Sequence, residues 1–314
     1  MKKIITIGEI VVEIMALETG TGFKQPIPLI GPFASGAPAI FIDQVAKMGQ
    51  PCGLVSAVGR DDFGALNIER LQRDGVDISA IGLHETAATG SAFVRYRPDG
   101  NRDFIFNIKH SACSAIGMTP QAEALIETAD HLHVMGSALF SESIVEAIHE
   151  ATIRIKAKGG TVSFDPNIRK EMLELPGMRE ALLHALDNCD LFMPSGEEIF
   201  LFTQATDERA AVAELLKRGI QTIVIKRGAQ GAHFFDRNRT IFAPAFKVEE
   251  VDPTGAGDSF GAAFVTCWLR GMPAEQTLEI ANATGARAVG VKGPMEGTST
   301  LQQIETFIAT AGAR

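Results

Sequence analysis

The chain has 314 residues, 46% of them hydrophobic and 21% charged, and these ordinary globular values exclude a wholly disordered protein. Its 29 Lys and Arg against 38 Asp and Glu leave a net charge of −9, which argues against a nucleic-acid partner but not against a small anionic ligand. No apolar stretch approaches the roughly 20 residues that cross a bilayer, and the four cysteines form no CxxC pair, so we expect a cytoplasmic protein with reduced thiols and no membrane partner.

Short β-branched runs alternate with segments of helical periodicity through most of the chain. This alternation predicts an α/β fold in which a mainly parallel sheet is covered by helices on both faces. The predicted strands are residues 3–8, 53–58, 131–135, 161–165, 190–193, 222–226 and 232–235, and the predicted helices are residues 37–48, 63–73, 120–128, 142–158, 208–218, 255–270, 273–291 and 301–311.

Two segments, residues 10–30 and 92–108, contain strand-like runs with no crossover helix. The second predicts a hairpin, because residues 92–97 and 102–108 flank a turn that contains Asp99-Gly100, and glycine tolerates the positive φ of such turns. A small β-element of this kind could be a lid that also pairs two copies as a homodimer. An edge extension of the main sheet is an equally open interpretation.

The most informative stretch, residues 251–260, reads VDPTGAGDSF. A predicted strand at 246–251 leads into a glycine-rich loop, and a helix follows. Glycines let the backbone approach a phosphate, and the free N–H groups and dipole of a helix N-terminus favour an anion. Asp258 falls in the first helical turn, where a carboxylate could simply complement the dipole or could act as a base beside a bound phosphate.

Three other motifs are excluded or disfavoured at this loop. The chain contains no Gly-Lys pair, so it has no P-loop, and Gly255, Gly257 and Gly261 have one residue too many between them for the dinucleotide fingerprint. Residues 257–261 match the GxSxG elbow of α/β-hydrolases, whose chain order requires a histidine after the serine. The last histidine is His233, so a hydrolase using Ser259 is disfavoured.

With these residues in view, the whole chain, residues 1–314, resembles the ribokinase-like, or PfkB, family of carbohydrate kinases. Residues 252–258 match the family signature Asp-Thr-x-Gly-Ala-Gly-Asp, with Pro253 in place of the Thr, and residues 58–64 match its VGxDxFG segment. Residues 224–232 resemble its nucleotide-side strand and turn. Residues 164–169 match the DxNxR form of its fructokinase-like and 2-keto-3-deoxygluconate-kinase-like branches.

The resemblance implies phosphorylation of a sugar hydroxyl by ATP, with Mg²⁺ and, in several branches, K⁺. Asp258 would take the hydroxyl proton, and Gly255, Ala256 and Gly257 would hold the transferring phosphate by their N–H groups. Glu198 would order Mg²⁺ through water, and Asp252 would lie near K⁺. The implied nucleotide-binding residues are Lys226, Gly228, Gly231, Thr254 and Asn282, and the implied sugar-binding residues are Glu13, Gly36, Arg102, Phe104, Lys109, Asn167, Arg169 and Asp258.

Departures from the family pattern fall mainly on the substrate side. The Asp that contacts the sugar in many relatives is Glu13 here, and the signature's sugar-contacting Asn is replaced by Ile40. On the metal side, Ser195 replaces the Asn of the NxxE motif. The sequence therefore indicates the reaction more clearly than the substrate. Two of the implied binding residues also have purely structural alternatives: Gly36 could cap a helix, and Asn282 could lie on a solvated helix face.

A ketohexose of the fructose or tagatose type is the first expectation for the substrate. The alternative is 2-keto-3-deoxygluconate, whose carboxylate Arg169 would bind, and further alternatives are a nucleoside or a sugar sensor without catalysis. Separately, His131 and His133 lie two apart on a predicted strand and so share a face. They could ligate a metal, but no third ligand lies nearby in sequence, so core histidines are the favoured interpretation.

Overall fold

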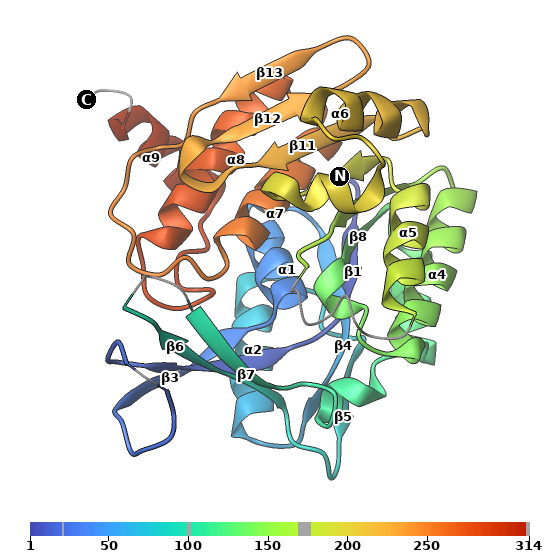
Figure 1. The fold of residues 1–314 in the computed structure, drawn as a ribbon. Coiled ribbons are helices and arrows are strands. Elements are labelled where there is room, and N and C mark those ends of the chain that lie inside the picture. The colour runs from blue at the N-terminus through green and yellow to red at the C-terminus, as the bar shows by residue number, and fades with distance from the viewer. Residues whose placement is uncertain (21, 99–101, 169–176, 312–314) are drawn as a thin grey trace.

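The computed structural model describes residues 1–20, 22–98, 102–168 and 177–311, and a nine-stranded sheet forms the centre of this part of the chain (Figure 1). The strands pair in parallel except at one edge, where β12 and β13 run antiparallel, so the predicted sheet is confirmed. In spatial order the strands are β13 (Thr240–Ala243), β12 (Ala232–Phe235), β11 (Thr222–Lys226), β10 (Leu191–Phe192), β9 (Thr161–Asp165), β8 (His131–Met135), β1 (Ile4–Ile7), β4 (Cys52–Gly59) and β5 (Ile81–His84).

Helices cover both faces of this sheet because successive strand residues point to opposite sides. Ile223 and Ile225 of β11 join one hydrophobic core, whereas Val224 between them joins the other. None of the helices described is long and apolar enough to cross a membrane. The first core is covered by α3 (Pro120–Glu127), α4 (Glu142–Ala157), α5 (Met178–Asn188) and α6 (Glu208–Lys217), and the second by α1 (Ala37–Lys47), α2 (Asp62–Asp74), α7 (Ala256–Leu269), α8 (Ala274–Val289) and α9 (Leu301–Ala311).

A separate four-stranded sheet, which we call the lid, lies against one end of the main sheet (Figure 1). Its order is β3 (Leu29–Ser35), β2 (Val11–Ala16), β6 (Gly90–Tyr96) and β7 (Arg102–Asn107). The predicted hairpin is confirmed as the antiparallel pair β6–β7, although its turn residues Asp99 and Gly100 lie outside the described residues. The interpretation of this hairpin as an edge of the main sheet is wrong.

One predicted strand, residues 246–251, is wrong. The segment leaves the sheet after Pro244 and has no strand structure. Its last residue, Val251, instead donates its N–H to the carbonyl of Val289 at the end of α8 at 2.8 Å, and the next residue, Asp252, donates to the same carbonyl at 3.1 Å. Periodicity did not reveal the edge strands β5 and β13 or the helix α5.

The two histidines of β8 are core residues, as favoured from the sequence. His131 and His133 are both 0% exposed, and both rings hydrogen-bond to the Ser163 hydroxyl, at 2.8 and 2.7 Å. The ring of His131 also contacts the Thr161 hydroxyl at 2.8 Å, and the ring of His133 stacks on Phe41. Burial lowers the pKa of His131 to about 3 and holds the pKa of His133 well below its usual value.

This histidine pair predicts acid sensitivity of the fold. Below pH of about 6.5 the unfolded chain protonates both side chains while the native state keeps them neutral, so the free energy of unfolding falls as the pH drops from about 6.5 towards 3. The limiting slope is about 1.4 kcal/mol per pH unit for each histidine. Urea titrations at several pH values should show a shallower slope for His131→Gln than for the wild type. Replacing the exposed His110 by Gln is the control, and equal slopes for all three proteins would contradict the assignment.

Candidate active site

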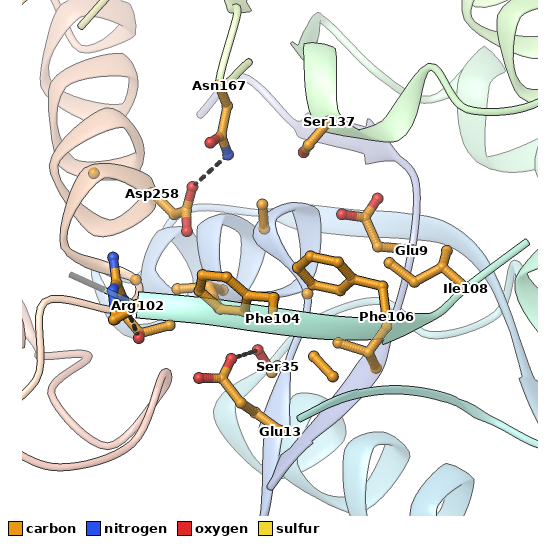
Figure 2. Close-up of a pocket in the computed structure, with 18 of the residues that line it drawn as sticks. Glu9, Glu13, Ser35, Arg102, Phe104, Phe106, Ile108, Ser137, Asn167 and Asp258 are labelled. Atoms are coloured by element: carbon orange, nitrogen blue, oxygen red, sulfur yellow. Dashed lines mark hydrogen bonds between the residues drawn. The ribbon is translucent and has the colours of Figure 1, made fainter. Parts of the chain in front are cut away.

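A cavity of about 740 Å³ lies between the lid and the carboxyl ends of the main strands (Figure 2). In parallel α/β sheets this edge is where strand ends and helix N-termini converge on ligands. The cavity is lined from β2 and β7 of the lid, from the start of α1, from the loops after β1, β8 and β9, and from residues 253–258. Most of the residues predicted to bind sugar or phosphate face it: Glu13, Gly36, Arg102, Phe104, Lys109, Asn167, Thr254, Gly255, Gly257 and Asp258.

The N-terminus of α7 forms one wall of this cavity. Gly255 precedes the helix with φ of +79°, and a Cβ there would lie 2.4 Å from the Pro294 carbonyl oxygen, so the chain needs glycine at this point. Ala256, Gly257 and Asp258 form the first turn, where a helix leaves N–H groups without an intrahelical carbonyl partner, and the Ala256 N–H donates to the Pro253 carbonyl of the preceding loop at 3.4 Å. The turn can therefore hold an anion, as the sequence predicts, although Ala256 itself is not among the residues that line the cavity.

Asp258 points into the same cavity (Figure 2). The side-chain amide of Asn167 donates a hydrogen bond to its Oδ1 atom at 3.3 Å. Asn167 has φ of +40°, and its own N–H donates to Asp165 at 3.2 Å, so the loop after β9 holds the amide in place. The arrangement gives a fixed carboxylate that can take a proton, beside a helix terminus that can hold an anion.

Beneath the α7 terminus lies a buried ion pair between Lys226 and Asp165. The neighbouring carboxylates of Asp165 and Glu198 keep the pKa of Lys226 above its usual value despite burial, so the ammonium stays charged. Its Nζ atom is 4.0 Å from where a Cβ on Gly257 would lie. Lys226 therefore lies close to the first turn of α7, paired with Asp165, although it does not line the cavity.

Glu198 sits next to this pair. Its two carboxylate oxygens accept N–H groups from Ile168 at 2.9 Å and from Ser195 at 2.6 Å, and burial raises its pKa. Among the described residues, no group of three or more Asp, Glu, His and Cys side chains could hold a metal ion by itself. A carboxylate such as Glu198, outside any such group, fits Mg²⁺, because this ion keeps several of its waters and binds mainly through substrate phosphates.

Asp252 organises the loop before α7. It is fully buried, and its oxygens accept the N–H groups of Thr254 at 3.0 Å and Gly293 at 3.1 Å. Its carboxylate also contributes, after burial, to raising the pKa of Tyr96 on lid strand β6. The role of Asp252 at a K⁺ site stays a prediction. Its hydrogen bonds link the loop before α7 to the segment at Gly293, and its charge acts on Tyr96 of the lid.

The predicted nucleotide-side residues form a second group around the turn between β11 and β12. Gly228 and Gly231 shape the turn, and a Cβ on Gly231 would lie 2.1 Å from the carbonyl oxygen of Ala243. Asn282 is buried, so its alternative place on a solvated helix face is wrong. Its amide donates to the carbonyls of Ala243 and Pro244 at 3.1 and 3.2 Å. The structure thus places Gly231 and Asn282 against the same segment, Ala243–Pro244, which Asn282 holds by two hydrogen bonds.

Sequence reasoning missed cavity residues that follow strand ends. Glu9, directly after β1, is only 4% exposed and lines the cavity, as does Ser137 after β8. The signal for Glu9 was a charged residue interrupting an apolar run at the carboxyl end of a strand. Arg169 lies outside the described residues. The hydrolase alternative has no support, because Ser259 is fully buried inside α7.

The comparisons with known proteins agree with this geometry. Residues 1–301 match the pfkB family of carbohydrate kinases. The chain is 31% identical to a 2-dehydro-3-deoxygluconokinase from Thermoproteus tenax (98% of this chain, 94% of the relative) and 30% identical to a fructokinase from Escherichia coli (97% and 98%). A provisionally named ribokinase II from E. coli, in complex with ATP and Mg²⁺, superposes with a TM-score of 0.93 at 49% identity (99% and 100%). The chain belongs to the pfkB family of carbohydrate kinases and has the ribokinase-like fold of that family.

Proposed function

We propose that this carbohydrate kinase transfers the terminal phosphoryl group of ATP to a hydroxyl of a ketohexose of the fructose or tagatose type. The observation that carries the proposal is that the Asp258 carboxylate and the N-terminal turn of α7 face one cavity. A base and an anion-binding turn in one site are what phosphoryl transfer to an alcohol requires.

In this mechanism Asp258 takes the proton of the attacking hydroxyl, and Asn167 holds the carboxylate in position. The first-turn N–H groups and the dipole of α7 hold the transferring phosphate, and the Lys226–Asp165 ion pair lies next to this turn. Mg²⁺ bound to the ATP phosphates would neutralise their charge, with Glu198 placed to order its waters. The lid excludes water from the cavity, which suppresses hydrolysis of ATP.

The cavity's carboxylates support a neutral sugar. Glu13 and Glu9 are 3% and 4% exposed, and Glu13 accepts a hydrogen bond from Ser35 at 3.2 Å. Buried carboxylates accept hydrogen bonds from sugar hydroxyls, whereas a sugar acid would bring a second negative charge into a poorly screened site. Phe104 and Phe106 stack on each other at 5.1 Å and add an apolar wall for a sugar face.

A 2-keto-3-deoxygluconate kinase is the second candidate. The exposed Lys109 lines the same cavity and could meet a carboxylate, and the 31% identical relative is a 2-dehydro-3-deoxygluconokinase. Arg169, the other cation expected to bind a sugar acid, lies outside the described residues. The two buried carboxylates that line the cavity, Glu9 and Glu13, favour the neutral ketohexose over the sugar acid.

The test is ADP release by the wild-type protein with D-fructose, D-tagatose, 2-keto-3-deoxygluconate and adenosine, with the phosphorylated product identified by mass. We expect a ketohexose to give the highest kcat/KM. Turnover of the keto acid alone would support the second candidate and that of adenosine a nucleoside kinase, whereas sugar binding without ADP release would support a sensor.

Glu13→Gln is the matched specificity variant, because it removes a charge and keeps the shape. We expect it to raise KM for the ketohexose. The ratio of kcat/KM for the keto acid to kcat/KM for the ketohexose should rise about tenfold, which corresponds to about 1.4 kcal/mol of changed charge interaction. Replacing Glu18, which is exposed in the loop between lid strands β2 and β3, by Gln should change neither the KM nor the ratio. An unchanged ratio in Glu13→Gln would contradict the role of this carboxylate.

We also propose that the enzyme works in the cytoplasm, where ATP is available and where its four buried free cysteines stay reduced. The homodimer that pairs through the lid stays a prediction. Leu29 and Ile30 of β3 and Ile105 of β7 are exposed on the lid strands, as a pairing surface would require.

A further inference from the structure

The lid contributes one guanidinium to the phosphate-binding end of the cavity. Arg102, the first residue of β7, donates a hydrogen bond from Nη1 to the Thr254 hydroxyl at 2.6 Å (Figure 2). Thr254 immediately precedes Gly255 in the loop that starts α7. Arg102 also lines the cavity together with Gly257 and Asp258, so a residue of the lid lies beside the turn that would hold the phosphate.

Arg102 differs from the other arginines of the same hairpin. Arg95 and Arg97 both form ion pairs with Asp103 on the neighbouring strand, so each of these guanidinium groups is engaged by a carboxylate within the lid. No carboxylate of the described residues lies within 4.0 Å of the Arg102 guanidinium, which instead lies 5.5 Å from the centre of the Phe104 ring. A contact with an aromatic face and a hydroxyl orients a guanidinium and leaves its charge for an anion.

Phosphoryl transfer needs positive charge at this place. In the reaction, the bond between the terminal phosphorus of ATP and its bridging oxygen breaks, and ADP leaves with the electron pair. A bond from the acceptor oxygen to phosphorus forms, and the hydroxyl proton passes to Asp258. The α7 turn offers N–H donors from one side, and the charge on the equatorial oxygens is best stabilised by a further cationic donor.

We propose that Arg102 is a catalytic residue of the phosphoryl transfer: supplied by the lid, it contacts the transferring phosphoryl group and stabilises its charge in the transition state. The proposal rests on the proposed kinase function and replaces the sugar-binding role that the resemblance implies for Arg102. It also means that closing the lid over the sugar completes the phosphate site, so that sugar binding and catalytic competence are coupled.

The kinetic test compares Arg102→Gln and Arg102→Lys with the wild type, using its best ketohexose. We expect Arg102→Gln to lower kcat about 10²-fold, the typical cost of losing one donor to a transition-state oxyanion, with KM for the sugar nearly unchanged. Arg102→Lys should recover part of kcat because it keeps the charge. Arg97→Gln is the matched control, since that side chain is 47% exposed and paired within the lid, and it should keep full activity.

A binding measurement separates this role from a lid contact. Calorimetry of ADP with aluminium fluoride and the sugar, a mimic of the transferring group, should show about 10²-fold weaker binding to Arg102→Gln than to the wild type, while ADP alone binds both equally. Equal affinity for the mimic, or a loss expressed only as a higher KM for the sugar, would overturn the proposal. The kinase proposal fails separately, on the wild type, if no sugar yields ADP.

Discussion

Replacing Asp258 by Asn is expected to lower turnover by about 10²–10⁴-fold, the usual contribution of a general base. The amide has the shape of the carboxylate, and its oxygen can still accept the hydrogen bond that Asn167 now donates at 3.3 Å. The α7 turn is left unchanged, so the affinity for ATP should stay near that of the wild type. Steady-state ADP release and calorimetric titration with ATP measure the two effects separately.

Asp62→Asn is the matched control for this variant. Asp62 also lies in the first turn of a helix, α2, but it is exposed and outside the cavity, so it complements a helix dipole and does nothing else visible in the structure. It should keep wild-type turnover. If Asp258→Asn retained more than about a tenth of the wild-type turnover, far above the range for a lost base, the carboxylate would not be the base.

The second large effect is expected on stability, from replacing Arg70 by Leu. Arg70 is only 11% exposed and binds Asp43 at 3.2 Å and Asp74 at 2.6 Å. It also donates to the Met295 carbonyl at 2.7 Å and the Thr298 hydroxyl at 2.9 Å. Removing one partner of a buried pair leaves an uncompensated charge, and the expected loss is about 3–5 kcal/mol of unfolding free energy.

The pH dependence of this loss follows from Asp43. Burial raises its pKa to about 7, Arg70 opposes the rise, and the neighbouring Asp74 adds to it. Without Arg70 the pKa of Asp43 rises further. A group with a raised native pKa loses its stabilising contribution as the pH rises through that pKa, so Arg70→Leu should be destabilised more at pH 8 than at pH 6.

Denaturant titrations of Arg70→Leu at both pH values measure the effect, with Arg73→Leu as the control. Arg73 lies on the same helix but is 68% exposed and pairs loosely with Asp74 at 3.5 Å. Its loss should stay within about 0.5 kcal/mol. An Arg70→Leu protein as stable as the control would contradict the account of this cluster.

The sequence predicted the fold well where a short apolar run is buried in the main sheet. The strand β11 has the predicted bounds because its apolar run is buried against the cores on both faces of the sheet, and the helix α9 also has the predicted bounds. The failures are segments whose partner decides their structure. Residues 246–251 look like a strand, but the Val251 N–H at their end donates to the Val289 carbonyl, and no local pattern reveals that partner.

The site divides in the same way. The α7 turn and Asp258 are contiguous in sequence, so the motif alone located them. The Lys226–Asp165 pair and the Arg102–Thr254 hydrogen bond join residues 61 and 152 positions apart, and only the folded chain shows them. Glu9 was visible in the sequence as a charge in an apolar run, but its place in the cavity depends on the lid.

The most direct test of the central claim is the structure of the protein with ADP, aluminium fluoride and its ketohexose bound. The account predicts the fluoride at the N–H groups of residues 255–257 and the acceptor hydroxyl of the sugar within hydrogen-bond distance of the Asp258 carboxylate. A nucleotide whose terminal group lay away from the α7 turn, or a sugar hydroxyl that faced another base, would contradict it.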